Sequence, residues 1–201
     1  MEKKIKFRHF RTEDTKKVAE IMALSFRSKF NRLTNVSEEK MPDFLIQLGI
    51  IYSSAFLGYI VAEENDEVVG VMALKWKNQK RSKSKSNLIK AIKYGIFNIM
   101  KMYLGLGLIK SKPKKGECYI EHIAVKSSAQ GEGIGSQLLE FGEKYAIEND
   151  FEEYTLHVSS LNEGAIKLYD RKGFMVLKTE FSMITNILFG IKKWYYMGRK
   201  L

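Results

Sequence analysis

The sequence predicts one domain of the mixed α/β (α+β) class over residues 1–201, and two observations support this prediction. Apolar, β-prone runs alternate along the chain with segments whose apolar residues recur at helical spacing. A length of 201 residues with 45% hydrophobic side chains suits a single folded core. The single cysteine, Cys118, excludes an intramolecular disulfide and a zinc site built on cysteine pairs.

In the first part of the chain, the pattern predicts a strand, a helix, a polar loop, a weaker helix, and two strands joined by a hairpin turn. Thr12 is the expected N-cap of the first helix, because two acidic residues follow it in the first turn. The hairpin turn is expected at Asn65 and Asp66, since these residue types tolerate positive φ. The six elements are expected over residues 4–10, 12–28, 31–40, 42–52, 56–62 and 68–76.

An uncharged run of 19 residues, 44–62, also has the length of a membrane span. Its glycines and the strand character of its second half favour the hairpin instead. The first six residues are too polar for a secretory signal. The expected compartment is therefore the cytoplasm.

The positive charge of the chain is concentrated in one segment. The chain has 34 basic and 23 acidic residues, and residues 68–116 contain 13 of the basic residues and no acidic one. Residues 77–116 are interpreted as a basic insert that begins with a loop over 77–86. An amphipathic helix is expected over 87–104, ended by Gly105 and Gly107. Its apolar face is expected to contain Leu88, Ile89, Ile92, Ile96, Met100 and Tyr103.

Two roles for this insert remain open at the level of sequence. Its apolar face can serve as a lid over a substrate cleft, or the insert can dock on an anionic membrane surface or an acidic partner. Specific nucleic-acid binding is not favoured, because Arg81 is its only arginine and aromatic side chains for base stacking are few.

In the second part of the chain, strands and helices alternate around a glycine-rich turn at residues 130–135. The helix after this turn is expected to bury Ile134, Leu138 and Leu139. Gly173 is expected to end a short later helix at its C′ position. Strands are expected over 118–125, 154–158, 174–179 and 191–200, the short helix over 162–171, and a connector over 181–190.

The glycine-rich turn is the segment most suggestive of chemistry. Its sequence is Gln130-Gly131-Glu132-Gly133-Ile134-Gly135-Ser136, between a strand and a helix. Such a turn leaves backbone N–H groups open at a helix N-terminus, where they bind phosphate or pyrophosphate. The turn lacks the Gly-Lys-Ser/Thr ending of an NTPase loop and the glycine spacing of a dinucleotide fingerprint. A tight turn that only needs positive φ is the alternative at this point.

Together with its flanking residues, the turn resembles the signature of the GNAT acetyltransferase superfamily. The resemblance is specific over residues 119–176, and the second signature follows the first at the expected distance. Gln130 stands where arginine is more frequent, and the insert at 77–116 is unusually long. The residues that carry the resemblance are Glu121-His122-Ile123-Ala124-Val125, Gln130-x-x-Gly133-x-Gly135, Leu156-His157-Val158, Asn162, Ala165, Leu168-Tyr169 and Gly173-Phe174.

The resemblance implies an acetyl-CoA-dependent N-acetyltransferase. Its mostly antiparallel sheet would be splayed in the middle and flanked by helices, with the insert before the fourth strand. The acetyl group would pass directly to a primary amine of a small molecule, peptide or protein in a ternary complex, without a metal ion. The coenzyme is expected to contact Ile123, Ala124, Val125, Gln130, Gly131, Glu132, Gly133, Ile134, Gly135, Ser136, Asn162 and Tyr169.

Glu121 and Tyr169 are the candidate catalytic residues. An ammonium acceptor needs a general base, and burial of Glu121 in an apolar strand would raise its pKa. Tyr169 is the candidate acid for the leaving thiolate, since a phenol has a pKa of about 10 and a thiol of about 8.5. The alternatives are an ion pair of Glu121 with a lysine and a packing role for Tyr169. Strand alternation places His122 on the face opposite Glu121.

The remaining candidate residues carry less chemistry. His9 and His157 stand alone without metal-ligand spacing, and Cys118 is expected to be a buried thiol. Trp76, Trp194, Tyr195 and Tyr196 are expected in the sheet and core, and the less favoured alternative is that some of them line an acceptor pocket. The rival hypothesis is a catalytically silent protein of this fold that binds coenzyme A and docks on an anionic membrane or acidic partner. A monomer or a homodimer is expected.

Overall fold

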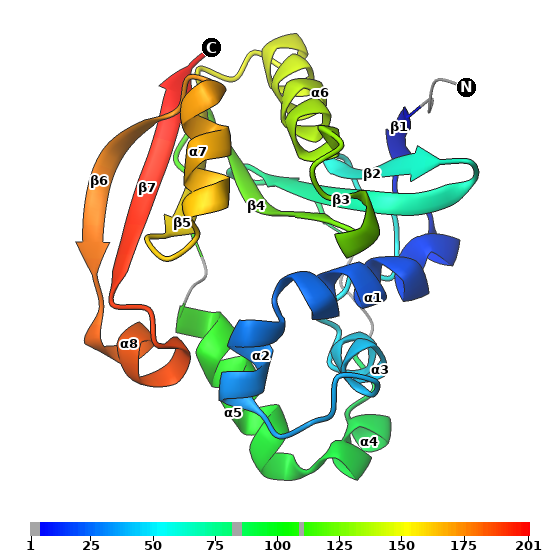
Figure 1. The fold of residues 1–201 in the computed structure, drawn as a ribbon. Helices are drawn as coiled ribbons and strands as arrows, with labels where there is room; N and C mark the ends of the chain where they lie inside the picture. Colours follow the sequence, from blue (N-terminus) through cyan, green and yellow to red (C-terminus); the bar gives the residue numbers. More distant parts are fainter. Residues whose placement is uncertain (1–4, 82–85, 109–110) are drawn as a thin grey trace.

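The computed structural model describes residues 5–81, 86–108 and 111–201, and it has helices on both faces of one seven-stranded sheet (Figure 1). The strands are β1 (Ile5–His9), β2 (Tyr59–Glu64), β3 (Glu67–Lys75), β4 (Glu117–Val125), β5 (Glu153–Ser159), β6 (Met175–Phe181) and β7 (Lys193–Lys200). The helices are α1 (Thr15–Ser25), α2 (Arg27–Leu33), α3 (Met41–Gln47), α4 (Leu88–Ala91), α5 (Ile96–Leu108), α6 (Ile134–Glu148), α7 (Glu163–Arg171) and α8 (Met183–Phe189).

The sheet has the strand order β1-β2-β3-β4-β5-β7-β6, and its neighbours are antiparallel except β4 and β5. The parallel β4–β5 pairing extends only from Glu117 opposite Glu153 to Ile120 opposite Leu156, although both strands continue. The two strands therefore diverge beyond Ile120. This confirms the predicted α/β class and the splayed, mostly antiparallel sheet.

Two apolar clusters, one on each face, hold the helices against the sheet. The cluster beneath α6 and α7 contains Ile134, Leu138 and Leu139, as predicted from the helical spacing. The opposite cluster joins α1, α2 and α3 to the sheet and continues to Met102 of α5. The insert thus belongs to the core of one face, because it buries side chains there.

The hairpin turn is confirmed, since Asn65 and Asp66 adopt φ values of 49° and 62°. The uncharged run at 44–62, which ends just before this turn, divides between α3 and β2. Over the described ranges, none of the helices combines the length and the apolar character needed to cross a bilayer.

The first predicted helix is interrupted, and its predicted cap is wrong. Thr12 opens a 3-10 turn, and α1 begins only at Thr15, after Asp14. At Phe26 the backbone leaves the helical region, with φ of −111°, and α2 then continues to Leu33 into the predicted loop. This break places the Phe26 side chain beside the divergence of β4 and β5.

The single amphipathic helix predicted for the insert is also wrong. Gly95 adopts φ of +93° and separates α4 and a 3-10 turn from α5. Gly105 and Gly107 lie inside α5 rather than ending it. A Cβ on Gly105 would lie 2.7 Å from Leu33 Cδ2, so this glycine allows the close approach of α5 to α2. The connector at 181–190 contains α8, and part of the predicted 77–86 loop lies outside the described residues.

Candidate active site

A β-bulge in β4 shapes the centre of the candidate site. The β3–β4 register passes from Ala73 opposite His122 to Leu74 opposite Ile120, which leaves Glu121 as the extra residue of the bulge. Because the bulge shifts the alternation, Glu121 and His122 line the same pocket. The prediction that they lie on opposite faces is wrong.

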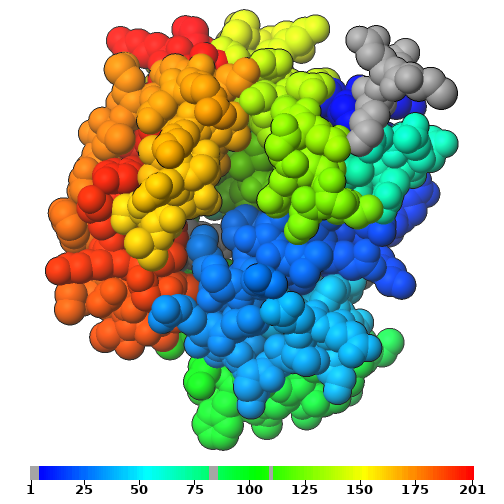
Figure 2. All heavy atoms as spheres, in the orientation of Figure 1, coloured from blue at the N-terminus to red at the C-terminus, as the bar shows by residue number. Residues whose placement is uncertain are grey.

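A cavity of about 650 Å³ lies between the end of β4, the glycine-rich turn and α7. Figure 2 shows the surface hollowed between α2 and the start of α7, where Phe26 and Asn162 border this cavity. Glu132 alone among the predicted coenzyme contacts does not border it, whereas the predictions missed Phe26 and Arg171. The predicted residues that line it are Ile123, Ala124, Val125, Gln130, Gly131, Gly133, Ile134, Gly135, Ser136, Asn162 and Tyr169.

The turn has the backbone geometry of an anion site. Gly131 and Gly133 have φ values of +86° and +82°, and Gly133 is the N-cap of α6. A Cβ on Gly131 would meet no atom within 4 Å, so the backbone conformation and not crowding calls for glycine. Gln130 Nε2 donates a hydrogen bond to the Val125 carbonyl at 3.1 Å and ties the turn to β4. An open N-terminus of a 15-residue helix thus faces a cavity large enough for an extended, phosphate-bearing ligand.

A second pocket, of about 490 Å³, lies beside the bulge and is mostly apolar. Tyr103, Leu106 and Gly107 of α5 form part of its wall, so the insert contributes to it. A hollow of about 420 Å³ at the divergence of β4 and β5 contains Glu121 and Tyr169 together and is bordered by Trp194. Since Phe26 borders all three cavities, they adjoin one another.

Glu121 is held by two cations and a phenol. Arg81 Nη1 and the Tyr52 hydroxyl donate to Glu121 Oε2 at 2.6 and 2.8 Å, and Lys75 Nζ lies 3.4 Å from Oε1. Burial alone would raise the pKa of Glu121, but attraction to Arg81 and its hydrogen bond outweigh burial and lower the pKa to about 2. The expected raised pKa is therefore wrong, and the carboxylate stays ionised. Arg81 does not line the pocket, so it fixes Glu121 without filling the space in front of it.

Tyr169 lies where the cavity of about 650 Å³ meets the hollow at the divergence. Burial raises the pKa of its hydroxyl to about 12, so the group keeps its proton at physiological pH. Lys29 lines the second pocket, its Nζ lies over the rings of Phe26 and Trp194 at 5.1 and 5.2 Å, and burial lowers its pKa to about 8. Cys118 is buried, as predicted, and burial raises the pKa of its thiol to about 12.

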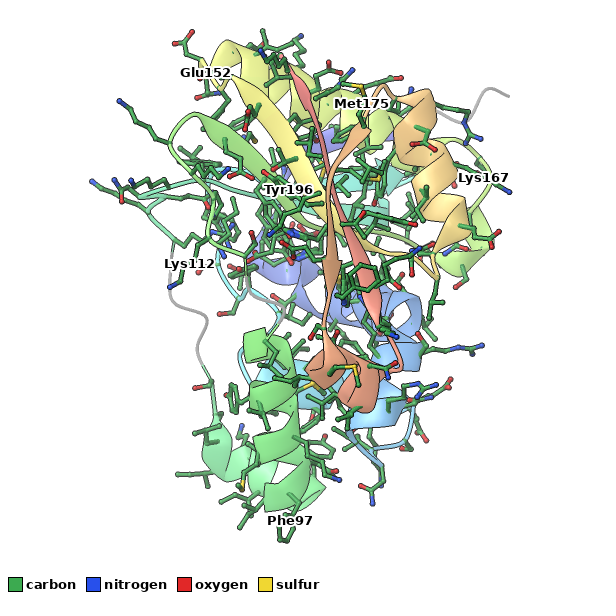
Figure 3. The ribbon with its side chains drawn as sticks, turned by 90° about the vertical axis from the view of Figure 1, so that its left-hand side faces the viewer. Phe97, Lys112, Glu152, Lys167, Met175 and Tyr196 are labelled. Carbon is green, nitrogen blue, oxygen red and sulfur yellow. The ribbon has the colours of Figure 1, made fainter. Side chains whose placement is uncertain are left out.

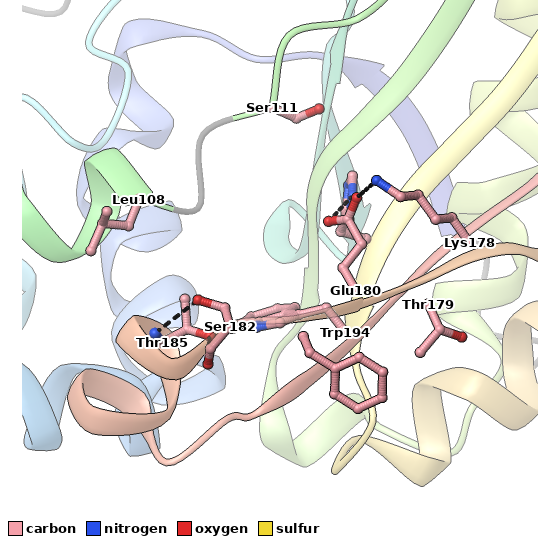
Figure 4. A pocket seen from close by; sticks show the side chains of 10 residues that line it. Leu108, Ser111, Lys178, Thr179, Glu180, Ser182, Thr185 and Trp194 are labelled. Atoms are coloured by element: carbon pink, nitrogen blue, oxygen red, sulfur yellow. Dashed lines mark hydrogen bonds and ion pairs between the residues drawn. The ribbon is translucent and has the colours of Figure 1, made fainter.

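His157 does not stand alone, contrary to the prediction. Its Nδ1 lies 3.1 Å from the Tyr119 hydroxyl, and its Nε2 lies 3.6 Å from Glu180. Tyr119 lines the pocket beside Glu121, while His157 and Glu180 line a further pocket near α8, bounded by Lys178 (Figure 4). Tyr119, His157 and Glu180 therefore form a chain of titratable groups between two pockets. No sequence motif joins them, because their approach depends on the registers of β4, β5, β7 and β6.

His122 gives the pocket a pH-sensitive wall. Its Nε2 is buried and has no hydrogen-bond partner among the described residues. Burial lowers the pKa of His122 to about 4, although the nearby Glu121 carboxylate opposes this shift.

No group of three or more His, Cys, Asp or Glu side chains in the described part of the chain is arranged to hold a metal ion.

We expect His122 to make the folded state less stable as the pH falls from about 6.5 to about 4. In this window the unfolded chain binds a proton that the folded chain does not, and the cost reaches up to about 3 kcal/mol. Urea unfolding at pH 7 and pH 4.5 should show a smaller pH dependence in His122→Gln than in the wild type. His9→Gln, at an exposed histidine, is the matched control. An equal pH dependence in all three proteins contradicts the prediction.

The sequence and the fold of this chain are similar to those of known acetyltransferases. A stretch of 67 residues, 33% of this chain, is 39% identical to mycothiol acetyltransferase from Acidimicrobium ferrooxidans. This match covers only 21% of that protein. A crystal structure of an acetyltransferase aligns with a TM-score of 0.62 at 23% identity, over 97% of this chain and 98% of that one. Arabidopsis thaliana Naa50, in complex with the bisubstrate analogue CoA-Ac-MVNAL, aligns with a TM-score of 0.59 at 17% identity, over 98% and 99%. These two structures share the fold.

The family assignment rests on a longer sequence match than the one to mycothiol acetyltransferase. Residues 16–174 match the acetyltransferase (GNAT) family, and this range includes α1, the bulge of β4, the glycine-rich turn and α7. The match thus spans every element that borders the coenzyme cavity and most of those around the second pocket. This chain belongs to the GNAT acetyltransferase family.

Proposed function

We propose that the protein transfers the acetyl group of acetyl-CoA to a primary amine by direct attack within a ternary complex. The observation that carries this proposal is the continuity of the cavities. The coenzyme cavity and the pocket beside Glu121 meet at Phe26 and at the hollow that contains Tyr169. A thioester and an amine bound in the two cavities would therefore meet at the divergence of β4 and β5, in the arrangement that a ternary complex requires.

The residues present fit acetyl-CoA. The positive φ of Gly131 and Gly133 and the open start of α6 suit its pyrophosphate. The edge of β4 from Ile123 to Val125 lines the cavity, where its backbone can bond the pantetheine amides. Asn162 caps α7 through its Oδ1, which accepts from Ala165 N at 3.2 Å, so its Nδ2 group is the donor left for the coenzyme arm. Acetyl-CoA, when bound, supplies the activated acyl group.

The side chains around the pocket suit an amine acceptor. The ionised Glu121 attracts an ammonium group and, through a water molecule, relays its proton onward, because a carboxylate with a pKa of about 2 does not retain a proton at working pH. Tyr119, His157 and Glu180 offer a path for that proton towards the pocket near α8. Tyr169 keeps its proton to about pH 12 and donates it to the departing sulfur.

The insert acts in this proposal as a wall of the acceptor pocket. The inner side of α5 contributes Tyr103 and Leu106 to the pocket, and Met102 is buried in the apolar cluster that also contains residues of α1, α2 and α3. The Tyr103 hydroxyl donates to the Leu48 carbonyl at 2.7 Å and fixes α5 over the pocket. The acceptor class is a small molecule, a peptide or a protein with a primary amine.

Tyr169→Phe tests this function through the leaving group. With acetyl-CoA and a panel of amines and peptides, release of free thiol should occur in the wild type. We expect the variant to lose about 10²-fold in kcat with unchanged coenzyme A affinity, because only the proton donor is removed. Tyr145→Phe, a hydroxyl deletion on α6 outside the cavities, should remain at wild-type rate. Binding of coenzyme A without thiol release in the presence of any amine would instead favour a silent protein of this fold.

A further inference from the structure

The outward side of α4 and α5 carries large apolar side chains that the rest of the chain leaves exposed. Ile89 is 85% exposed and Phe97 is 78% exposed. Figure 3 shows Phe97 at the tip of the molecule, at the end opposite Met175. We call this surface the α4–α5 face. It consists of Leu88, Ile89, Ile92, Ile96, Phe97, Met100, Leu104 and Leu108.

The helix α5 is apolar around most of its circumference, with Asn98 and Lys101 as exceptions. Met102 and Gly105 are buried on its inner side, and the exposed Ile96, Met100 and Leu104 follow each other at four-residue spacing along its outer side. Lys101 is its only charged residue. A helix with so much apolar surface is normally covered on most sides, whereas the described residues of this protein cover only the inner side of α5.

We propose that the α4–α5 face docks on an anionic lipid bilayer, with α5 lying along the headgroup region. Charge complementarity identifies the occupant. Residues 86–108 contain Lys90, Lys93 and Lys101 and no acidic residue. Lys93 pairs with Asp43 at 3.1 Å, while Lys90 and Lys101 form no ion pair within the described ranges. Apolar side chains flanked by lysines bind interfaces where acyl chains meet anionic headgroups.

The length of α5 decides between lying on the bilayer and crossing it. Its 13 residues span about 20 Å, less than the roughly 30 Å of a hydrocarbon core.

A second copy of this chain is disfavoured as the occupant, because a two-fold interface would bring the lysines of both copies together. Docking would hold the wall of the acceptor pocket about one helix diameter, roughly 10 Å, from the headgroups.

The experiment is flotation with vesicles of phosphatidylcholine, with or without about 30% phosphatidylserine. The wild type should float with the anionic vesicles, and less so when the salt concentration rises from about 0.1 M to about 0.5 M. The double variant Ile89→Gln/Phe97→Gln should bind about 100-fold more weakly, since it removes two side chains from the contact. Lys90→Gln/Lys101→Gln should weaken binding about tenfold and reduce its salt dependence.

Two exposed apolar residues elsewhere provide the matched control. Ile147 on α6 and Met175 on β6 are 54% and 66% exposed, and Ile147→Gln/Met175→Gln should float like the wild type. Absence of flotation overturns the proposal, as does equal loss in the control variant. A wild-type dimer in light scattering that Ile89→Gln/Phe97→Gln converts to a monomer, with no vesicle binding, would assign the face to a second copy. Thiol release with soluble amines does not enter this test, so its outcome is independent of the proposed reaction.

Discussion

Gly133→Asp should reduce the affinity for coenzyme A by about 10³-fold or more. Gly133 is the N-cap of α6 and borders the coenzyme cavity. A carboxylate there would face the pyrophosphate at about 5 Å, where each pair of like charges costs roughly 3 kcal/mol at an effective dielectric constant of about 20. The same charge would also oppose ligand binding at the open helix N-terminus. Isothermal titration calorimetry with coenzyme A measures the loss.

Gly133→Asn is the control that separates charge from backbone strain. Asn and Asp are alike in size, and both tolerate the φ of +82° that Gly133 adopts. A Cβ at this position would meet only Gln137 Nε2, at 3.9 Å, so neither substitution is blocked by crowding. We therefore expect the Asn variant to bind coenzyme A within about tenfold of the wild type. Equal affinity of the Asp variant and the wild type would place the pyrophosphate elsewhere.

The local structure of the glycine-rich turn and of the start of α7 could be predicted from sequence because its determinants are local. Gly131 and Gly133 fix the turn through their own φ, and Asn162 caps the helix that begins after it. Each of these features depends on residues within a few positions. The hairpin at Asn65 was predictable for the same reason.

The acceptor side could not be predicted because its determinants are tertiary. A bulge adds one residue to β4 without a signature in the sequence, and this residue is Glu121. Arg81 is 40 positions away in the chain, so sequence alternation offered no reason to pair it with that carboxylate. The same applies to Tyr119 and His157, which come together only through the β4–β5 pairing. The predicted pKa direction of Glu121 failed because burial was considered without these partners.

Glu121→Gln should lower kcat by about 10²- to 10⁴-fold and leave coenzyme A affinity near that of the wild type. The substitution keeps the shape of the side chain and removes the charge and the basic oxygen. Glu63→Gln is the matched control, since Glu63 is also a strand glutamate, held at 2.6 Å by Arg8, and lies outside the cavities. Steady-state kinetics with the best amine of the panel gives the result. A rise in KM with unchanged kcat would make Glu121 a binding group for the ammonium and not the base.

The variant Arg81→Met is a second test of Glu121 as the base, and the quantity measured is the pH dependence of activity. With the pKa of Glu121 at about 2, the base is ionised at every working pH and wild-type activity shows no acidic limb from it. Removal of Arg81 deletes the largest opposing attraction and leaves burial to raise the pKa. A base must be unprotonated, so activity should then fall as the pH decreases through the new pKa, and the acidic limb of kcat/KM should enter the range above about pH 4. If the pH profile of Arg81→Met is the same as that of the wild type, and Glu121→Gln keeps full turnover, Glu121 is not the base. The Tyr119–His157 pair would then be the candidate base.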